Sequence, residues 1–130
     1  PDYRRSIELV VPGQAPKQVH LGDEAVLGVA CDNRGKRIWA VLGRWEQQRG
    51  NHELLLISDA GEVTQRRALK PWTLKAGSPI QWNPVTNQLL MTLTRPKQTH
   101  ARAGLIDGDS LKLIKVINTP ISEAQWLHAG

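Results

Sequence analysis

Residues 31–41 read CDNRGKRIWAV, and residues 82–92 read WNPVTNQLLMT. Each stretch begins at a short apolar end, passes through a polar turn and continues into a run of residues that favour β-strands. The segments that follow them also match, because residues 54–61 read LLLISDAG and residues 102–109 read RAGLIDGD. Together the two matches predict two copies of one hairpin-based unit.

The spacing between matching positions gives the length of this unit. The positions are Asp59 and Asp107 (107 − 59 = 48), Arg44 and Arg95 (95 − 44 = 51), and residues 80–82 and 124–126, which read IQW and AQW. A period of about 40 to 50 residues built from strands is typical of a β-propeller or another stacked array. One unit cannot bury its own apolar face, so fold and function both depend on what stacks beside it.

The composition is that of one globular domain spanning residues 1–130. Its hydrophobic fraction of 40% and charged fraction of 22% argue against disorder. The net charge of +5 is a modest bias that solubility explains. Basic and acidic residues are mixed along the chain without a recognised binding module, so we do not expect a nucleic-acid partner.

Two further features of the sequence concern cysteine chemistry and membranes. The one cysteine, Cys31, has no partner for an intramolecular disulfide, and its apolar neighbours predict a small buried side chain. No apolar run is long enough to span a membrane, and the first residues lack the apolar segment of a signal peptide. The cellular compartment stays open.

Short aliphatic or β-branched runs separated by Gly, Asn, Asp and Pro predict an all-β fold. Four-stranded antiparallel meanders are expected at residues 25–69 and 78–117, with partial units at 6–11 and 122–126. The predicted strands are 25–31, 36–43, 52–58 and 62–69 in the first unit, and 78–82, 88–94, 101–106 and 110–117 in the second. The Pro-containing segments 70–77 and 118–120 are expected to connect one sheet to the next.

The segments 82–87, WNPVTN, and 32–38, DNRGKRI, resemble the strand-turn-strand step of blades in TolB-like and WD-repeat propellers. In these families a short inner strand ends in a turn of the Ser/Asn-Pro-Asp-Gly type, which leads to a second, apolar strand. The resemblance covers most of residues 25–126 and implies propeller-like blades. Trp82 stands where such blades often carry an aromatic residue, whereas the first unit has Cys31 in that place.

The number of blades leaves three arrangements open. A closed propeller needs about four to eight blades, and this chain supplies two with two partial ones. The chain is then part of a larger propeller, or several copies assemble into a ring, or the sheets pack face to face as a β-sandwich.

Candidate binding residues gather in the loops between the second and third strand of each unit, which are expected at one end of the blades. Trp45 stands among polar neighbours in the longest loop, where an exposed indole would anchor a protein or stack on a sugar; the alternative is that it folds back over its own sheet. His52 and His100 are expected at matching places before the third strands. The candidates are Arg44, Trp45, Arg49 and His52 in the first unit, and Arg95, Lys97 and His100 in the second.

The other tryptophans are expected to have packing roles. Trp39 alternates with Ile38 and Ala40 and is predicted in the core. Trp72, next to Pro71, is predicted in the seam between sheets. Trp82 and Trp126 are expected to stack in successive blades.

No catalytic or metal-binding signature stands out. Asp and Gly in the turns at 59–61 and 107–109 are what a tight hairpin needs, and each turn has too few ligands for calcium. Two histidines from different blades do not make a zinc site. We therefore predict no catalytic residues, no metal and no cofactor.

Three functions remain as hypotheses. The leading one is a non-enzymatic interaction module of β-propeller type that binds a protein partner through its loops. The second is a lectin-like carbohydrate-binding protein that forms a homo-oligomer. The third is a fragment of a propeller enzyme.

Overall fold

The computed structural model describes residues 6–10, 13–21, 24–32, 34, 36–43, 51–95 and 100–121. All regular elements in these ranges are β-strands, and every strand pair is antiparallel, which confirms the predicted all-β class. The strands are β1 (Ser6–Leu9), β2 (Lys17–His20), β3 (Ala25–Asp32), β4 (Arg37–Gly43), β5 (Glu53–Ser58), β6 (Val63–Ala68), β7 (Thr73–Leu74), β8 (Gln81–Asn83), β9 (Gln88–Thr94), β10 (Ala101–Asp107) and β11 (Leu113–Ile121).

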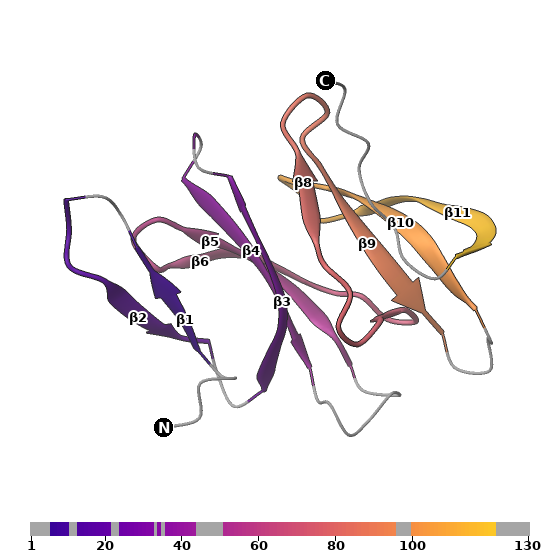
Figure 1. Cartoon of the computed structure of the whole chain (residues 1–130), viewed down its shortest axis with the longest axis horizontal. Helices are drawn as coiled ribbons and strands as arrows, with labels where there is room; N and C mark the ends of the chain where they lie inside the picture. Colours follow the sequence, from indigo (N-terminus) through magenta and orange to yellow (C-terminus); the bar gives the residue numbers. More distant parts are fainter. Residues whose placement is uncertain are drawn as a thin grey trace.

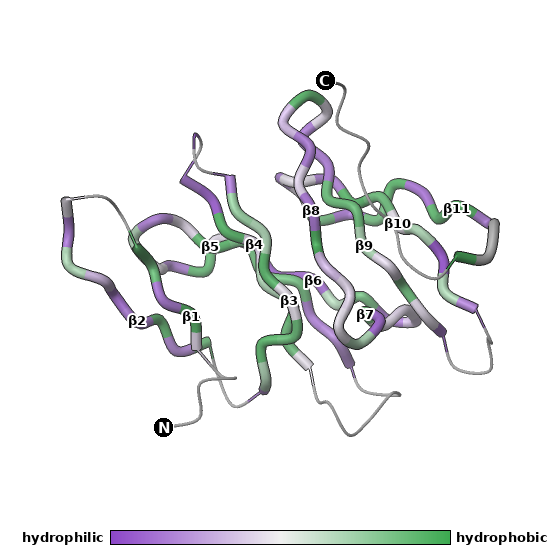
Figure 2. The backbone as a smooth tube through the Cα atoms, viewed as in Figure 1, coloured by the Kyte–Doolittle hydropathy of each residue, from purple (hydrophilic) through white to green (hydrophobic). Residues whose placement is uncertain are grey.

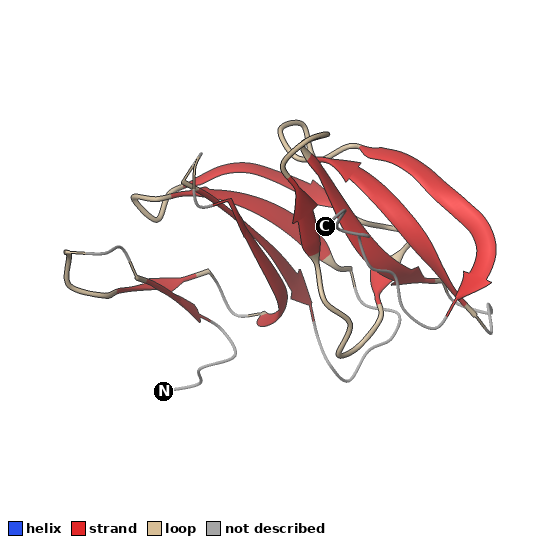
Figure 3. Ribbon diagram, turned by 45° about the horizontal axis from the view of Figure 1, so that its top comes forward, coloured by secondary structure: helices blue, strands red, loops and turns tan. Residues whose placement is uncertain are grey.

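The strands form three stacked sheets (Figures 1 and 3). The first is the hairpin β1-β2, and the middle sheet is the meander β3-β4-β5-β6. The third sheet has the order β11-β10-β9-β7, and β8 also pairs with β9. Both predicted meanders are thus present, with β7 added in the segment expected to be a connection.

The two central strands of the middle sheet, β4 and β5, are buried on both faces, which explains their continuous apolar runs (Figure 2). One face packs against the third sheet; it contributes Trp39, Val41, Leu54 and Leu56 to a core shared with Leu74, Ile80, Leu89, Met91, Leu93 and Ile106. The other face packs against the hairpin; it contributes Ala40, Leu42, Leu55 and Ile57 to a core shared with Leu9, Val19 and Leu21. Alternation along each strand sends successive side chains into different cores.

The two meanders have corresponding registers. The turn from β3 to β4 is closed by the pair Asp32 and Arg37, and the turn from β8 to β9 by the pair Asn83 and Gln88. Arg37 in turn pairs with Ser58, as Gln88 pairs with Asp107.

A register shift also recurs at corresponding places. It lies between Leu56 and Ile57 where β5 meets β6, and between Leu105 and Ile106 where β10 meets β11. Each shift adds one residue to the outer strand, as a β-bulge does.

These registers correct the alignment of the third strands by one residue. Ser58, rather than Asp59, takes the place of Asp107, and both side chains accept backbone hydrogen bonds within their turns. His52 corresponds to Ala101 rather than to His100, because the next residues, Glu53 and Arg102, pair with Leu42 and Leu93.

Cys31 is a second correction, because it is exposed rather than buried. A register shift between Val26 and Gly28 in β3 precedes it. Beyond this shift Ala30 points into the shared core, so Cys31 and Val29 lie on the opposite face, and Val29 is 40% exposed. The hairpin does not cover this part of the face.

The predicted strand at 6–11 is shorter than expected and has a partner, since β1 pairs with β2 from Ser6–His20 to Leu9–Lys17. The predicted partial unit at 122–126 lies outside the described residues.

Candidate functional site

The most organised polar cluster of the described residues surrounds Arg37, at the first residue of β4. Its Nε and Nη2 donate to Asp32 Oδ2 at 3.0 and 2.8 Å. Nη1 donates to Asp109 Oδ1 at 2.6 Å, and Nη2 donates to Asn87 Oδ1 at 3.0 Å. Asp32 belongs to the middle sheet, whereas Asn87 and Asp109 lie in turns of the third sheet. Arg37 therefore ties the two sheets together at one end of their interface.

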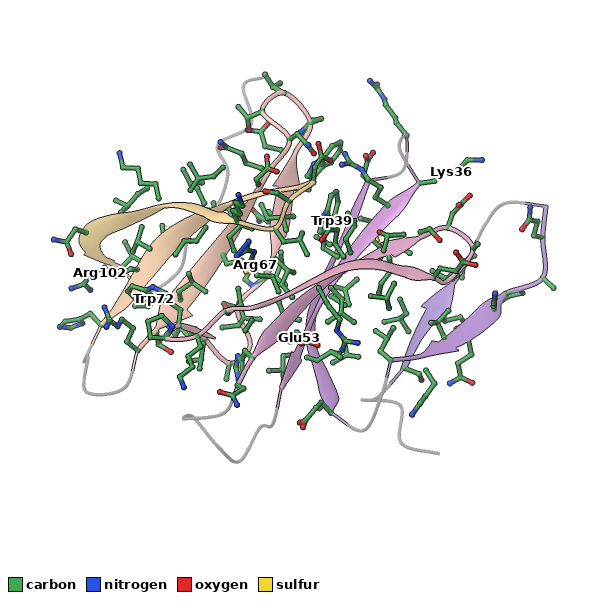
Figure 4. The ribbon with its side chains drawn as sticks, turned by 180° about the vertical axis from the view of Figure 1, so that it is seen from behind. Lys36, Trp39, Glu53, Arg67, Trp72 and Arg102 are labelled. Atoms are coloured by element: carbon green, nitrogen blue, oxygen red, sulfur yellow. The ribbon has the colours of Figure 1, made fainter. Side chains whose placement is uncertain are left out.

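Two tryptophans lie beneath the Arg37 guanidinium. Its carbon is 4.9 Å from the centroid of the Trp39 ring and 5.6 Å from that of Trp82. The two rings stack with centroids 5.7 Å apart and an interplanar angle of 25°. Trp39 is fully buried, and Figure 4 shows it between the two sheets. Cation–π attraction and stacking add to the hydrogen bonds of the cluster.

Both indole nitrogens have hydrogen-bond acceptors in the turns of the third sheet. Trp39 Nε1 donates to the Gly108 carbonyl at 2.9 Å, and Trp82 Nε1 donates to Asn87 Oδ1 at 3.0 Å. Asn87 has a φ of 54°, a left-handed conformation that Asn tolerates. Gly108 donates its N–H to the Asn87 carbonyl, and a Cβ on Gly108 would lie 2.6 Å from Asn87 Oδ1. The turn thus requires glycine at this position.

Asp107 holds the turn from β10 to β11 in shape. Its Oδ2 accepts hydrogen bonds from Ser110 N at 2.7 Å, Ser110 Oγ at 2.8 Å and Asp109 N at 3.2 Å. These bonds, chiefly those from Ser110, favour the ionised carboxylate and hold the pKa of Asp107 below its usual value. The turn presents Asp109 to Arg37.

The Arg37 cluster is built for packing rather than for catalysis. The guanidinium makes four hydrogen bonds within the protein and rests on two aromatic rings. Asp32, its main counter-ion, is 3% exposed. A network satisfied in this way fixes the relative position of two sheets and leaves few donors for a ligand.

Of the residues predicted to bind a partner, Arg44, Trp45, Arg49 and Lys97 lie outside the described residues. The structure describes His52, Arg95 and His100.

His52 is inside the protein, with an exposure of 4%. Its Nδ1 accepts a hydrogen bond from Leu74 N at 2.9 Å, and its carbonyl accepts one from Leu69 N at 2.9 Å. It thereby fastens the chain between β6 and β7 to the start of β5. Desolvation lowers the pKa of its imidazole, and the charge of Glu24 opposes this effect.

Arg95 and His100 are exposed. They stand on either side of residues 96–99, which lie outside the described residues. The Arg95 guanidinium carbon lies 5.0 Å from the centroid of the Trp72 ring. Trp72 is half-buried and packs against the shared core, in agreement with the predicted role in the seam between sheets. Trp72 and Arg102 lie at this same end of the third sheet (Figure 4). The structure thus brings Arg95 and His100 to one end of the third sheet, where both are exposed. His52 is buried and does not share a surface with them.

Sequence reasoning did not find the Arg37 cluster as a unit. It predicted the turn that precedes Arg37 and the turns that contain Asn87 and Asp109, but treated each as a local hairpin feature. The repeat of the turn segments in the sequence is the signal that could have found them. If the two units stack in the same orientation, their equivalent turns lie at the same end, so the polar side chains of these turns can meet.

No group of three His, Cys, Asp or Glu side chains within the described ranges is arranged to hold a metal ion. Among the same residues there is no helix with the length and apolarity needed to cross a bilayer.

No protein-family model matches the chain, and searches of curated proteins and of solved structures find no significant match.

Proposed function

We propose that this protein is a non-enzymatic interaction module of β-propeller type. In this proposal the two meanders are successive blades, and the hairpin β1-β2 is the outer half of a third. The blades belong to a larger propeller or to a ring of several copies. A protein partner binds at the loops between the second and third strand of each blade.

The observation that carries the proposal is the direction in which the sheets stack. The middle sheet turns Ile38, Ala40 and Leu42 toward the hairpin, that is, toward the preceding sheet. The third sheet turns Leu89, Met91 and Leu93, the corresponding residues, toward the middle sheet. If a two-fold axis related the two sheets, the same face of each sheet would be in contact. Here, instead, one face of each sheet packs on the opposite face of the sheet before it. This is the arrangement of repeat arrays, in which every unit contacts only its neighbours.

The strand directions support a common binding end. β4 and β9 run toward the same end of the molecule (Figure 1), and the predicted partner residues follow these two strands. At this end the structure contributes the exposed side chains of Arg95 and His100. A guanidinium held over Trp72 suits recognition of carboxylates on a partner protein.

The described tryptophans give less support to a lectin. Trp39 is fully buried, Trp82 stacks on it, and Trp72 lies beneath Arg95. A sugar-binding tryptophan needs a free ring face, so these three rings are already used within the protein.

The solution mass tests the ring form of the proposal. Light scattering coupled to size exclusion should give a defined multiple of the 14.5 kDa chain. Val29, 40% exposed, corresponds to Ile80, which packs between the sheets. Val29→Glu should therefore lower the mass, because it places a charge where the next copy would stack.

Val85→Glu is the matched control, since Val85 is 90% exposed in the turn between β8 and β9. It should leave the mass unchanged. A wild-type monomer would refute the ring, and an equal loss of mass in both variants would show that the effect is not specific to the stacking face.

A further inference from the structure

The two outer strands β6 and β11 occupy corresponding edges of their sheets but differ in sequence. β6 reads VTQRRA, and the first five residues of β11 read LIKVI. Among the described strands, β6 pairs only with β5, and β11 pairs only with β10. Within the described residues both strands therefore have a backbone edge that no other strand covers, and both have the same bulge.

The β6 edge is protected against further strand pairing by its side chains. Its residues are exposed, and Thr64, Gln65, Arg66 and Arg67 are polar or charged. Arg66 also donates to Glu53 on β5. Charged and polar side chains of this kind are a common way to prevent unwanted pairing at a sheet edge.

The β11 edge has no comparable protection over residues 113–117. Leu113, Ile114 and Ile117 are 42%, 50% and 39% exposed. Lys115 is the one charged residue of this segment and is exposed, and no ion pair joins it to an acidic side chain among the described residues. Pro120 lacks an N–H and limits strand pairing beyond this segment. Hydrophobic stretches of β11 are visible in Figure 2.

We propose that residues 113–117 of β11 bind an extended segment of a partner protein by β-strand addition, and that an acidic residue of this segment pairs with Lys115. Backbone hydrogen bonds supply the attachment, and alternate side chains of the segment cover the exposed apolar residues. Charge selects the partner. An antiparallel pairing of two copies centred on this segment would bring two Lys115 side chains close together, which disfavours a second copy. The inference depends on this edge alone and not on the loop-binding function.

The probe is a capped peptide of alternating Val and Thr with a central Glu, carrying a fluorophore, and anisotropy measures its binding. The same peptide with a central Lys should bind about threefold or more weakly, because it replaces an attractive cross-strand pair by a repulsive one. Lys115→Glu should reverse this preference. Gln65→Glu is the matched control, since Gln65 pairs with Leu56 as Lys115 pairs with Leu105, and it should change neither affinity.

A second variant gives β11 the side chains of β6. Ile114→Thr combined with Ile117→Arg introduces the residues found at the corresponding positions 64 and 67, and it should abolish binding while the cooperative melting transition remains. The proposal is overturned if neither peptide binds, if Lys115→Glu leaves the preference unchanged, or if the double variant binds like the wild type. A fall in solution mass caused by the double variant would show that a second copy occupies the edge, which also overturns it.

Discussion

Trp39 and Trp82 stack across the boundary between two sheets, with ring centroids 5.7 Å apart. Trp39 comes from β4 of the middle sheet and Trp82 from β8 of the third sheet. Their contact joins residues far apart in the sequence, and each indole nitrogen donates to a turn of the third sheet. The stack and the Arg37 cluster above it therefore determine how the sheets sit on each other, which the first two predictions test.

Replacing Arg37 with Ala should lower the free energy of unfolding by about 2 kcal/mol, because it leaves Asp32 buried without its main counter-ion. Urea unfolding followed by tryptophan fluorescence measures the change. Arg66→Ala removes an exposed pair with Glu53 and should cost much less. Equal losses in the two variants would contradict the structural role given to the cluster.

Gly108→Ala should destabilise the protein by about 1 to 3 kcal/mol, because its Cβ would overlap Asn87 Oδ1 and the Asn87 carbonyl. The movement needed to relieve the overlap would also disturb the bond from Trp39 Nε1 to the Gly108 carbonyl. Ala60→Gly, in the turn between β5 and β6, is a control with the opposite change and should have a small effect. A Gly108→Ala protein with wild-type unfolding would show that the turn relaxes freely.

His52 should make stability fall as the pH is lowered from about 7 to 5. Desolvation lowers its pKa in the folded protein, so the unfolded chain takes up the proton first, near its ordinary value of 6.5. The stabilising contribution is therefore complete above pH 6.5 and is lost as the pH falls from there toward the lower folded pKa. Urea midpoints measured at several pH values follow this loss.

His52→Asn keeps an acceptor for Leu74 N and removes the titrating group. Its stability should change less over the same pH interval. An unchanged pH dependence would assign the effect to other groups. Asp107 does not interfere, because its pKa lies below its usual value and its contribution is lost only in more acidic solution.

In a single native copy Cys31 should react with a maleimide, though slowly, because its side chain is exposed while desolvation raises the pKa of its thiol. Mass spectrometry should show one label per chain without denaturant. In a ring, a second copy stacked on the face of Val29 should protect Cys31. Labelling only after urea is added would mean that another part of the chain, or another copy, covers this face in solution.

The sequence was sufficient for the fold class and for most strands, because short apolar runs and Asp, Asn and Gly turns act locally. β7 was missed, since two residues in a Pro-containing connection have no periodicity, and their pairing with Thr94 and Leu93 is set by the third sheet. Cys31 was misplaced because a bulge reverses which residues of β3 face the core. The Arg37 cluster depends on the stacking of sheets, which no local pattern encodes.

The close fit between Gly104 and Leu93 bears on how the chain avoids misfolding. A Cβ on Gly104 would lie 2.4 Å from Leu93 Cδ1, whereas the corresponding residue of the middle sheet is the large Leu55. A hairpin exchanged between the two meanders would thus create an overlap in one sheet and a void in the other. Similar units within one chain are prone to such mispairing. Unequal side-chain sizes at corresponding positions give each hairpin a single sheet in which it fits.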